Sequence, residues 1–293
     1  MESEGGHLRR MIRSVRFLVA VGVIGLLAAP DVRAHDDPDA TLQRLDAEIA
    51  ANPQDAELWQ TRAVHMRRSG DFARANADLD RAVDFGLAAP TAHRDRGLIR
   101  LDERRFAEAE AMLRLARQLA PHEPTILLGH ARALAALERF DEASQTYAEL
   151  VEVAPQTGPD VRLEQIRAVA ARRGSNALDE AIRAADAAIA AIGSVPALEQ
   201  AALDLELRAD RVDAALARLD RMASGMGRRD AVLLQRAAVL EKAGRKEAAK
   251  TAYADALAAT ETLTDARRAT PAAREMENQA RDAIARLARG DPE

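Results

Sequence analysis

The chain has 293 residues, of which 48 % are hydrophobic and only 3 % aromatic, so a buried core must be built mainly from small and aliphatic side chains. Ala is the strongest helix former, and this composition predicts an all-α protein. The formal net charge is −5, whereas a nucleic-acid-binding protein normally carries an excess of Lys and Arg, so no nucleic-acid partner is expected. The chain has no cysteine, which excludes disulfides, thiolate metal sites and thiol catalysis.

Residues 1–34 have the features of a secretory signal peptide. Four arginines precede an uncharged run from Phe17 to Ala29, and Val32 and Ala34 supply small residues at a cleavage site after Ala34. A membrane-spanning helix needs about 20 apolar residues, and the run is shorter than this, which favours cleavage of the segment over its retention as an anchor. The pattern is typical of a bacterial protein that is periplasmic or secreted.

Cleavage after Ala34 would place His35 at the mature N-terminus. A terminal amine beside an imidazole can bind copper, but a solvated tail is the simpler interpretation of this segment. No metal site or cofactor is therefore expected from it.

A pattern recurs at a constant period through the N-terminal half. In each of the segments 70–75, 104–109 and 138–143, the third residue is phenylalanine and the sixth is alanine. Small residues and prolines recur at the same spacing, as shown by Ala63, Gly97 and Ala131, by Ala82 and Ala116, and by Pro121 and Pro155.

These columns resemble the tetratricopeptide repeat family, whose unit of about 34 residues has small residues at positions 8, 20 and 27, an aromatic residue at 17 and a proline at 32. Two helices can cross closely only where their contact points are Gly or Ala, and the proline prevents the second helix from continuing into the next unit. The resemblance implies a right-handed α-solenoid of about six helical hairpins with flanking capping helices.

The register changes once. Ala181, Ala215 and Ala249 follow the same period as the earlier columns, whereas Ala143 and Ala181 are separated by four residues more than one period. We therefore expect a four-residue lengthening of the fourth hairpin turn, near residues 173–177, with Ser or Asn capping a helix that begins near Ala177.

The later units match the family pattern less well than the first three. Position 17 carries Leu178, Val212 and Lys246, so the aromatic residue is lost. Glu199 also stands where a large apolar residue is usual.

The solenoid is expected to cover residues 35–290, with a terminal helix at each end that covers an apolar face. Leu42, Leu45 and Ile49 form an apolar stripe before the first hairpin. After the sixth hairpin, Thr270 followed by proline predicts the start of a C-terminal capping helix over residues 271–289.

No catalytic motif is present. The sequence contains no glycine-rich phosphate loop and no zinc-protease pattern. His65, His93 and His130 fall at different positions of their repeats, which favours ordinary surface or packing roles over a shared metal site. An enzyme is the least expected class.

The resemblance implies that the first helices of successive hairpins line a concave groove that binds a protein or peptide. The groove residues expected from positions 5, 9, 12 and 13 are Gln60, Val64, Arg67, Arg68, Arg94, Leu98, Leu101, Leu128, Arg132 and Arg162. Arginine can hold a carboxylate while its aliphatic stem packs on an apolar surface, so this lining suits a peptide with apolar and acidic side chains. The alternative is a groove that is merely solvated and binds no peptide. Family members that grip a C-terminal carboxylate use Lys and Asn where this chain has Gln60 and Val64.

The expected function is therefore that of an exported scaffold or adaptor that holds a partner polypeptide in the groove. The alternative is a structural or oligomerisation module of a cell-envelope complex, which would use the convex face or the end helices. Function resides in the site and not in the fold, so the partner and the oligomeric state stay open.

Overall fold

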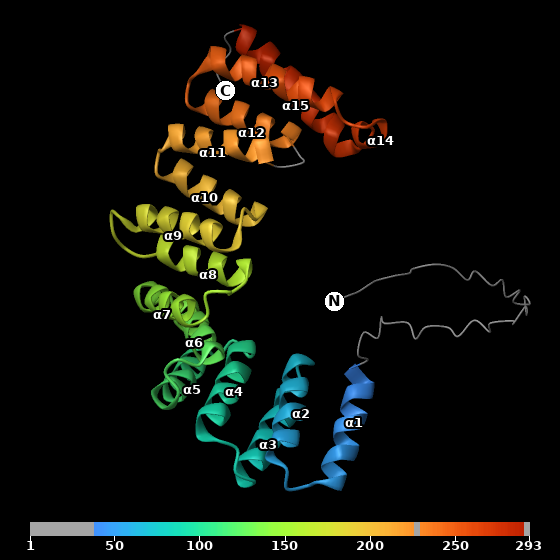
Figure 1. Cartoon of the computed structure of the whole chain (residues 1–293), viewed down its shortest axis with the longest axis vertical. Coiled ribbons are helices and arrows are strands. Elements are labelled where there is room, and N and C mark those ends of the chain that lie inside the picture. The colour runs from blue at the N-terminus through green and yellow to red at the C-terminus, as the bar shows by residue number, and fades with distance from the viewer. Residues whose placement is uncertain (1–37, 226–228, 290–293) are drawn as a thin grey trace, which may run out of the picture.

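The computed structural model describes residues 38–225 and 229–289, and these ranges form a stack of 15 helices arranged as an open arc (Figure 1). Helix α1 (Pro38–Ala51) stands alone, and α14 (Asp265–Arg268) and α15 (Pro271–Arg289) end the stack. Between them lie six hairpins: α2 (Ala56–Arg68) with α3 (Phe72–Asp84), α4 (Ala89–Asp102) with α5 (Phe106–Leu119), α6 (Pro124–Ala136) with α7 (Phe140–Val153), α8 (Pro159–Ala170) with α9 (Ala177–Ile192), α10 (Pro196–Arg208) with α11 (Val212–Gly225), and α12 (Arg229–Lys242) with α13 (Lys246–Glu261).

The predicted all-α solenoid of six hairpins with flanking helices is confirmed. The described ranges contain no strand, and none of their helices is long and apolar enough to cross a bilayer. The proposed signal peptide and His35 lie outside the described residues.

The two helices of each hairpin cross at small residues. Ala75, Ala109 and Ala143 on the second helices are fully buried. One close approach is at Gly97 of α4, where an added Cβ would lie 2.6 Å from Cγ of the fully buried Leu113 on α5. A separation this short is not available to any residue that has a side chain, so the crossing of α4 and α5 requires glycine.

The turn inside each hairpin repeats with the same backbone pattern. The second of its three residues has a left-handed conformation in five hairpins, with φ of 84° at Gly70, 62° at Arg104, 57° at Glu138, 56° at Asp210 and 72° at Gly244. The amide of the following residue donates to a carbonyl five residues back, which satisfies the end of the first helix as in a Schellman motif. Three of these five positions hold a residue other than glycine, so the turn tolerates local strain.

The fourth hairpin differs from the others, and the extra four residues are divided between two places. The turn between α8 and α9 has six residues instead of three, and the connection from α7 to α8 has five residues instead of the four between α5 and α6. Helix α9 begins at Ala177 as predicted, but Asn176 makes no capping bond to the backbone. The side-chain amide of Asn176 donates instead to the Glu180 carboxylate at 2.6 Å.

Ion pairs join successive hairpins at a fixed sequence separation. A guanidinium on the first helix of one hairpin donates to an aspartate on the helix before it in three places: Arg62 to Asp46, Arg96 to Asp80 and Arg236 to Asp220, at 2.6, 2.6 and 2.7 Å. The aspartates are more than half exposed, so each pair contributes little to stability by itself. Their recurrence indicates that the joined helices, α1 with α2, α3 with α4 and α11 with α12, meet in a similar orientation.

A buried charge cluster replaces this pattern between α9, α10 and α11. The guanidinium of Arg218, with 4 % of its side chain exposed, donates to Glu206 at 2.8 and 3.0 Å, to Glu199 at 3.1 Å and to Asp186 at 2.7 Å. Ser194 also donates to Glu199 at 2.7 Å. This network explains why Glu199 occupies a position that usually carries an apolar residue.

Both ends of the stack are covered by apolar stripes. Leu45 and Ile49 of α1 are buried against the first hairpin. At the other end Ala280 and Leu287 of α15 pack on the last hairpin, and Thr270 accepts a hydrogen bond from the backbone amide of Ala273 at 3.3 Å. The predicted N-terminal and C-terminal capping helices are therefore confirmed.

Replacing Arg218 by leucine is expected to lower the free energy of unfolding by about 3–5 kcal/mol, because Glu199 and Glu206 would remain buried without a counter-charge. Replacing all three by leucine should recover most of that loss, since no unpaired buried charge remains. Urea unfolding followed by circular dichroism measures both. A single variant as stable as wild type would show that the cluster does not hold these three helices together.

Candidate partner-binding groove

The first helices of the hairpins form the inner side of the arc. Helices α2 and α4, α4 and α6, and α8 and α10 pack against one another although each pair is separated by a second helix in the chain. Second helices of successive hairpins meet through long side chains instead, as at Arg117 and Glu149 of α5 and α7 and at Arg218 and Asp186 of α11 and α9. Because the first helices lie closer together, they occupy the concave side of the curve in Figure 1.

Nine of the ten expected groove residues keep solvent-exposed surface on these helices. They are Gln60, Val64, Arg67 and Arg68 on α2, Arg94, Leu98 and Leu101 on α4, and Leu128 and Arg132 on α6. Arg162 is the exception, because it is only 5 % exposed and donates to the backbone carbonyl of Pro155 at 2.7 Å. The expectation that Arg162 lines the groove is wrong.

The physical reason is the one extra residue before α8. It moves the register of α8 by one position, so that Leu163 and Arg167 take the places that the unbroken period assigns to Arg162 and Ile166.

A signal for this shift is present in the sequence. Proline marks the start of a helix, and Pro90, Pro124 and Pro159 lie in the first turns of α4, α6 and α8. The separation of Pro124 and Pro159 exceeds that of Pro90 and Pro124 by one residue. The spacing of these prolines therefore places one residue of the register change before α8.

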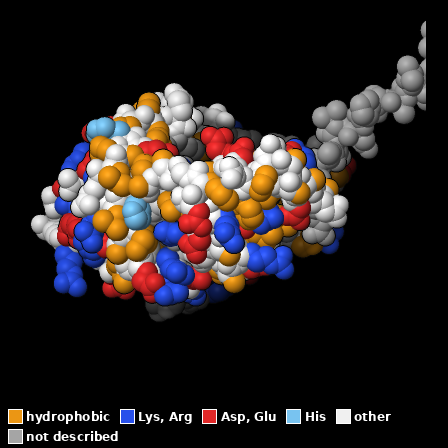
Figure 2. Space-filling view, turned by 90° about the horizontal axis from the view of Figure 1, so that it is seen from below, with side chains coloured by type: hydrophobic (Ala, Val, Ile, Leu, Met, Phe, Trp, Pro, Cys, Tyr) orange, Lys and Arg blue, Asp and Glu red, His pale blue; other side chains and the backbone are white. Residues whose placement is uncertain are grey.

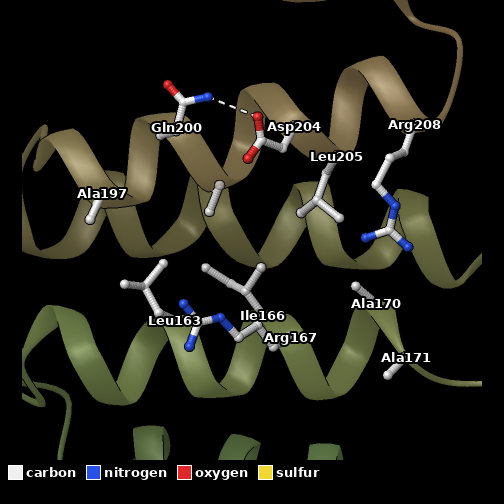
Figure 3. Close-up of a pocket in the computed structure, with 11 residues that line it drawn as sticks. Leu163, Ile166, Arg167, Ala170, Ala171, Ala197, Gln200, Asp204, Leu205 and Arg208 are labelled. Carbon is white, nitrogen blue, oxygen red and sulfur yellow. Dashed lines mark hydrogen bonds between the residues drawn. The ribbon is translucent and has the colours of Figure 1, made fainter.

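In the corrected register, α8 and α10 border an open cavity of about 460 Å³ at their groove positions (Figure 3). Its lining from α8 comprises Leu163, Ile166, Arg167, Ala170 and Ala171. Its lining from α10 comprises Ala197, Gln200, Ala201, Asp204, Leu205 and Arg208. The cavity is thus a mainly apolar trough between two successive first helices, with charged groups along its sides.

Several groove arginines are already paired within the chain. Arg67 donates to Asp102 at 2.5 Å, and Arg94 donates to Asp95 at 2.7 Å. Asp95, which is 4 % exposed, also accepts from Gln60 at 2.8 Å. The bonds from Arg67 and Gln60 link α2 to α4, so polar groove residues of the first two hairpins brace neighbouring helices.

A second brace connects α6, α7 and α8. Arg132 donates two hydrogen bonds of 2.8 Å to Glu164, and the hydroxyl of Tyr147 donates to the same carboxylate at 2.8 Å. Burial opposes the charge on Glu164, but the bonds from Arg132 and Tyr147 outweigh it and lower the pKa of this carboxyl below its usual range. Burial and the same carboxylate raise the pKa of Tyr147, so its hydroxyl stays protonated as the donor.

Three guanidiniums of the inner face do not brace neighbouring helices through carboxylates. Arg68, Arg167 and Arg208 form no hydrogen bond or ion pair with another residue of the ranges that the structure describes. The charge of Arg167 acts on Glu164, but from beyond ion-pair distance. Arg68 lies at the end of α2, whereas Arg167 and Arg208 both lie in the cavity.

The sequence-based assignment missed both cavity arginines. Arg167 was missed because the assignment relied on the unbroken period. Arg208 was missed because the expected lining was assigned only in the first four units.

The N-terminal end of the arc carries charges of both signs interspersed with apolar side chains, with no extended area of one sign on the face that Figure 2 shows. Within residues 38–225 and 229–289 no three side chains of His, Asp or Glu are grouped to hold a metal ion. His130 is 6 % exposed, and burial together with the nearby Arg117 lowers the pKa of its imidazole. Its ring lies beside Arg117 and Glu110 of α5.

Comparison with known families supports the repeat assignment over part of the chain. Residues 100–168, from the end of α4 to α8, match the family model described as tetratricopeptide repeat. Comparison with curated proteins gives no match.

Solved structures with the same kind of solenoid are similar to this chain. YrrB, described as a TPR protein with an unusual peptide-binding site, gives a TM-score of 0.50 at 20 % identity, covering 61 % of this chain and 90 % of YrrB. The pilF protein of Pseudomonas aeruginosa gives 0.50 at 14 % identity, covering 73 % and 95 %. Yeast Tom70 gives 0.50 at 14 % identity, covering 74 % of this chain but only 45 % of Tom70. At these identities the likeness establishes the fold alone.

Replacing Glu164 by glutamine is expected to lower the free energy of unfolding by about 1–2 kcal/mol at neutral pH, because two charge-assisted bonds from Arg132 are lost. The folded-state pKa of Glu164 is lowered, so its charge stabilises the fold above the pKa of the unfolded chain, near 4.5, and this contribution disappears as the pH falls through the lower folded-state value. Thermal unfolding of both proteins from about pH 7 to pH 3 measures the difference. A gap that stays constant over this range would contradict the ionic brace.

Proposed function

We propose that this chain is an exported scaffold that binds a segment of another protein along the inner face of its helical arc. The observation that carries this proposal is the open trough formed by successive first helices, with exposed side chains on α2, α4 and α6 and a cavity of about 460 Å³ between α8 and α10. An extended or helical peptide can cross several of these helices at once and contact each of them.

The similar proteins support this class of function. Tetratricopeptide repeats generally mediate contacts between proteins, and the match to that family reaches three of the helices that border the inner face. YrrB, whose fold is similar, is described with a peptide-binding site. Both facts favour a protein partner over a small-molecule substrate.

Export is proposed from residues 1–34, with their basic head, short apolar run and small residues before His35. When the full chain is produced in a Gram-negative bacterium, the protein recovered from the periplasm should begin at His35. N-terminal sequencing and intact mass measure this directly. A protein that stays in the cytoplasm with residues 1–34 attached would contradict export, and Ala34→Glu, which blocks cleavage, is the matched control.

Photo-cross-linking distinguishes the inner face from the outer one. A benzoylphenylalanine placed at Arg68 or Arg208 should give adducts of defined mass with partner proteins in the cells that naturally make this chain. Neither guanidinium has a partner in the described ranges, so both substitutions should leave the thermal unfolding temperature unchanged within about 2 °C.

The matched controls are Leu119 on α5, which is 57 % exposed, and Arg183 on α9, both on second helices. These two positions should give no adduct. Adducts from Leu119 or Arg183 alone, or adducts with a second copy of the chain through α15, would instead favour the alternative of a structural or oligomerisation module in a cell-envelope complex.

A further inference from the structure

The trough between α8 and α10 has an apolar floor. Leu163 and Ile166 of α8 stand between the two helices opposite Leu205 of α10, and the remaining floor is made of alanines (Figure 3). Ile166 and Leu205 are almost fully buried and belong to the core cluster of hairpins four and five, so the floor is rigid. A preformed apolar cavity of this kind accepts an aliphatic side chain without a prior rearrangement.

Charged groups flank this floor unevenly. Arg167 and Arg208 project from α8 and α10, and neither has a hydrogen bond or an ion pair within the described ranges. The one acid in the lining, Asp204, is turned toward Gln200, which donates to it at 2.8 Å (Figure 3). The lining therefore holds two cations that form no ion pair and one anion that is already hydrogen-bonded.

We infer that this trough is the specificity site of the groove and that it takes a partner segment with an aliphatic side chain next to acidic side chains. This inference rests on the proposed groove function. The aliphatic side chain occupies the floor of Leu163, Ile166 and the alanines. Carboxylates beside it accept hydrogen bonds from Arg167 and Arg208, which supply the planar donor fork that matches a carboxylate.

The trough lies between two successive first helices, and the first helix before them in the chain, α6, carries Leu128 among the side chains that keep exposed surface. A polypeptide can therefore run through it and on to the neighbouring helices, whereas a small metabolite would leave most of the inner face empty. This continuity favours a peptide segment as the occupant.

The test is selection from a display library of random peptides of about 12 residues, each able to span up to about 40 Å when extended, on the mature protein. The wild-type chain should enrich peptides with Leu, Ile or Val within a few residues of Asp or Glu. Fluorescence anisotropy with the most enriched peptide should show about tenfold weaker binding for each of Arg167→Gln and Arg208→Gln, as expected for one charge-assisted hydrogen bond.

Two further variants complete the design. Ala197→Trp places a large side chain on an exposed position of the trough and should abolish binding of the same peptide. Arg183→Gln, outside the trough on α9, should leave the affinity unchanged. Thermal unfolding of every variant verifies that the solenoid is intact.

The outcomes separate the inference from the function on which it rests. Peptides that are enriched but show no acidic preference, or whose affinity is unaffected by both arginine variants, would overturn the inference and leave the groove function standing. No enriched peptide at all would overturn both. A wild-type protein that is oligomeric and becomes monomeric in Ala197→Trp would also overturn the inference, because the trough would then hold a second copy of the chain.

Discussion

The close crossing of two helices at small residues is the constraint on which the remaining structure depends. At Gly97 the backbone of α4 comes so near to Leu113 that any Cβ would overlap with it, and the alanines at the other crossings are fully buried. This proximity makes each hairpin a flat unit with two apolar faces. Such a unit cannot bury both faces alone, so hairpins must stack, and the stack needs α1 and α15 to cover its ends.

Stacking leaves the angle between units to be set by polar contacts. Apolar packing in the core clusters is non-directional, so directional polar contacts can further limit the rotation between neighbouring units. Ion pairs such as Arg62–Asp46 and Arg236–Asp220, and the buried cluster around Arg218, restrict this freedom at successive interfaces. On the inner side, the bonds of Arg67 to Asp102 and of Arg132 to Glu164 fix the separation of neighbouring first helices and with it the curvature.

Most of the fold could be predicted from the sequence because its determinants are local and periodic. Alanines that recur at the repeat period, an aromatic residue at the start of three second helices and Thr270 before the last helix each act within one hairpin or helix. The details that could not be predicted depend on contacts between segments. Glu199 is explained only by its hydrogen bonds with Arg218 and Ser194, which lie on other segments. The left-handed backbone of Arg104 could not be predicted from its residue type, because arginine usually avoids that conformation.

The predicted placement of exposed residues on the first helices holds where the period is unbroken, and it does not hold for Arg162, which follows the register change. Nine residues on α2, α4 and α6 retain exposed surface as expected, but one extra residue before α8 rotates that helix so that Arg162 is buried and Arg167 lines the trough. A single-residue shift turns the side-chain pattern by about 100°, which is enough to move a position from the exposed side of a helix into the core. Exposure shows only the placement of these residues, and their role in binding stays a prediction.

The distribution of paired and unpaired groove arginines along the arc follows from the register of the first helices. In the first three hairpins the guanidiniums of Arg67, Arg94 and Arg132 hold carboxylates of the chain itself, and a partner would have to break those bonds before using them. Breaking a formed ion pair costs about as much as forming a new one returns, so these positions add contact area with little net affinity. Arg167 and Arg208 have no such bond to lose, and they border an apolar floor on which water is easily displaced. Binding energy in a protein interface is concentrated in a few such sites, which supports the proposal that the discriminating contacts of the groove lie between α8 and α10.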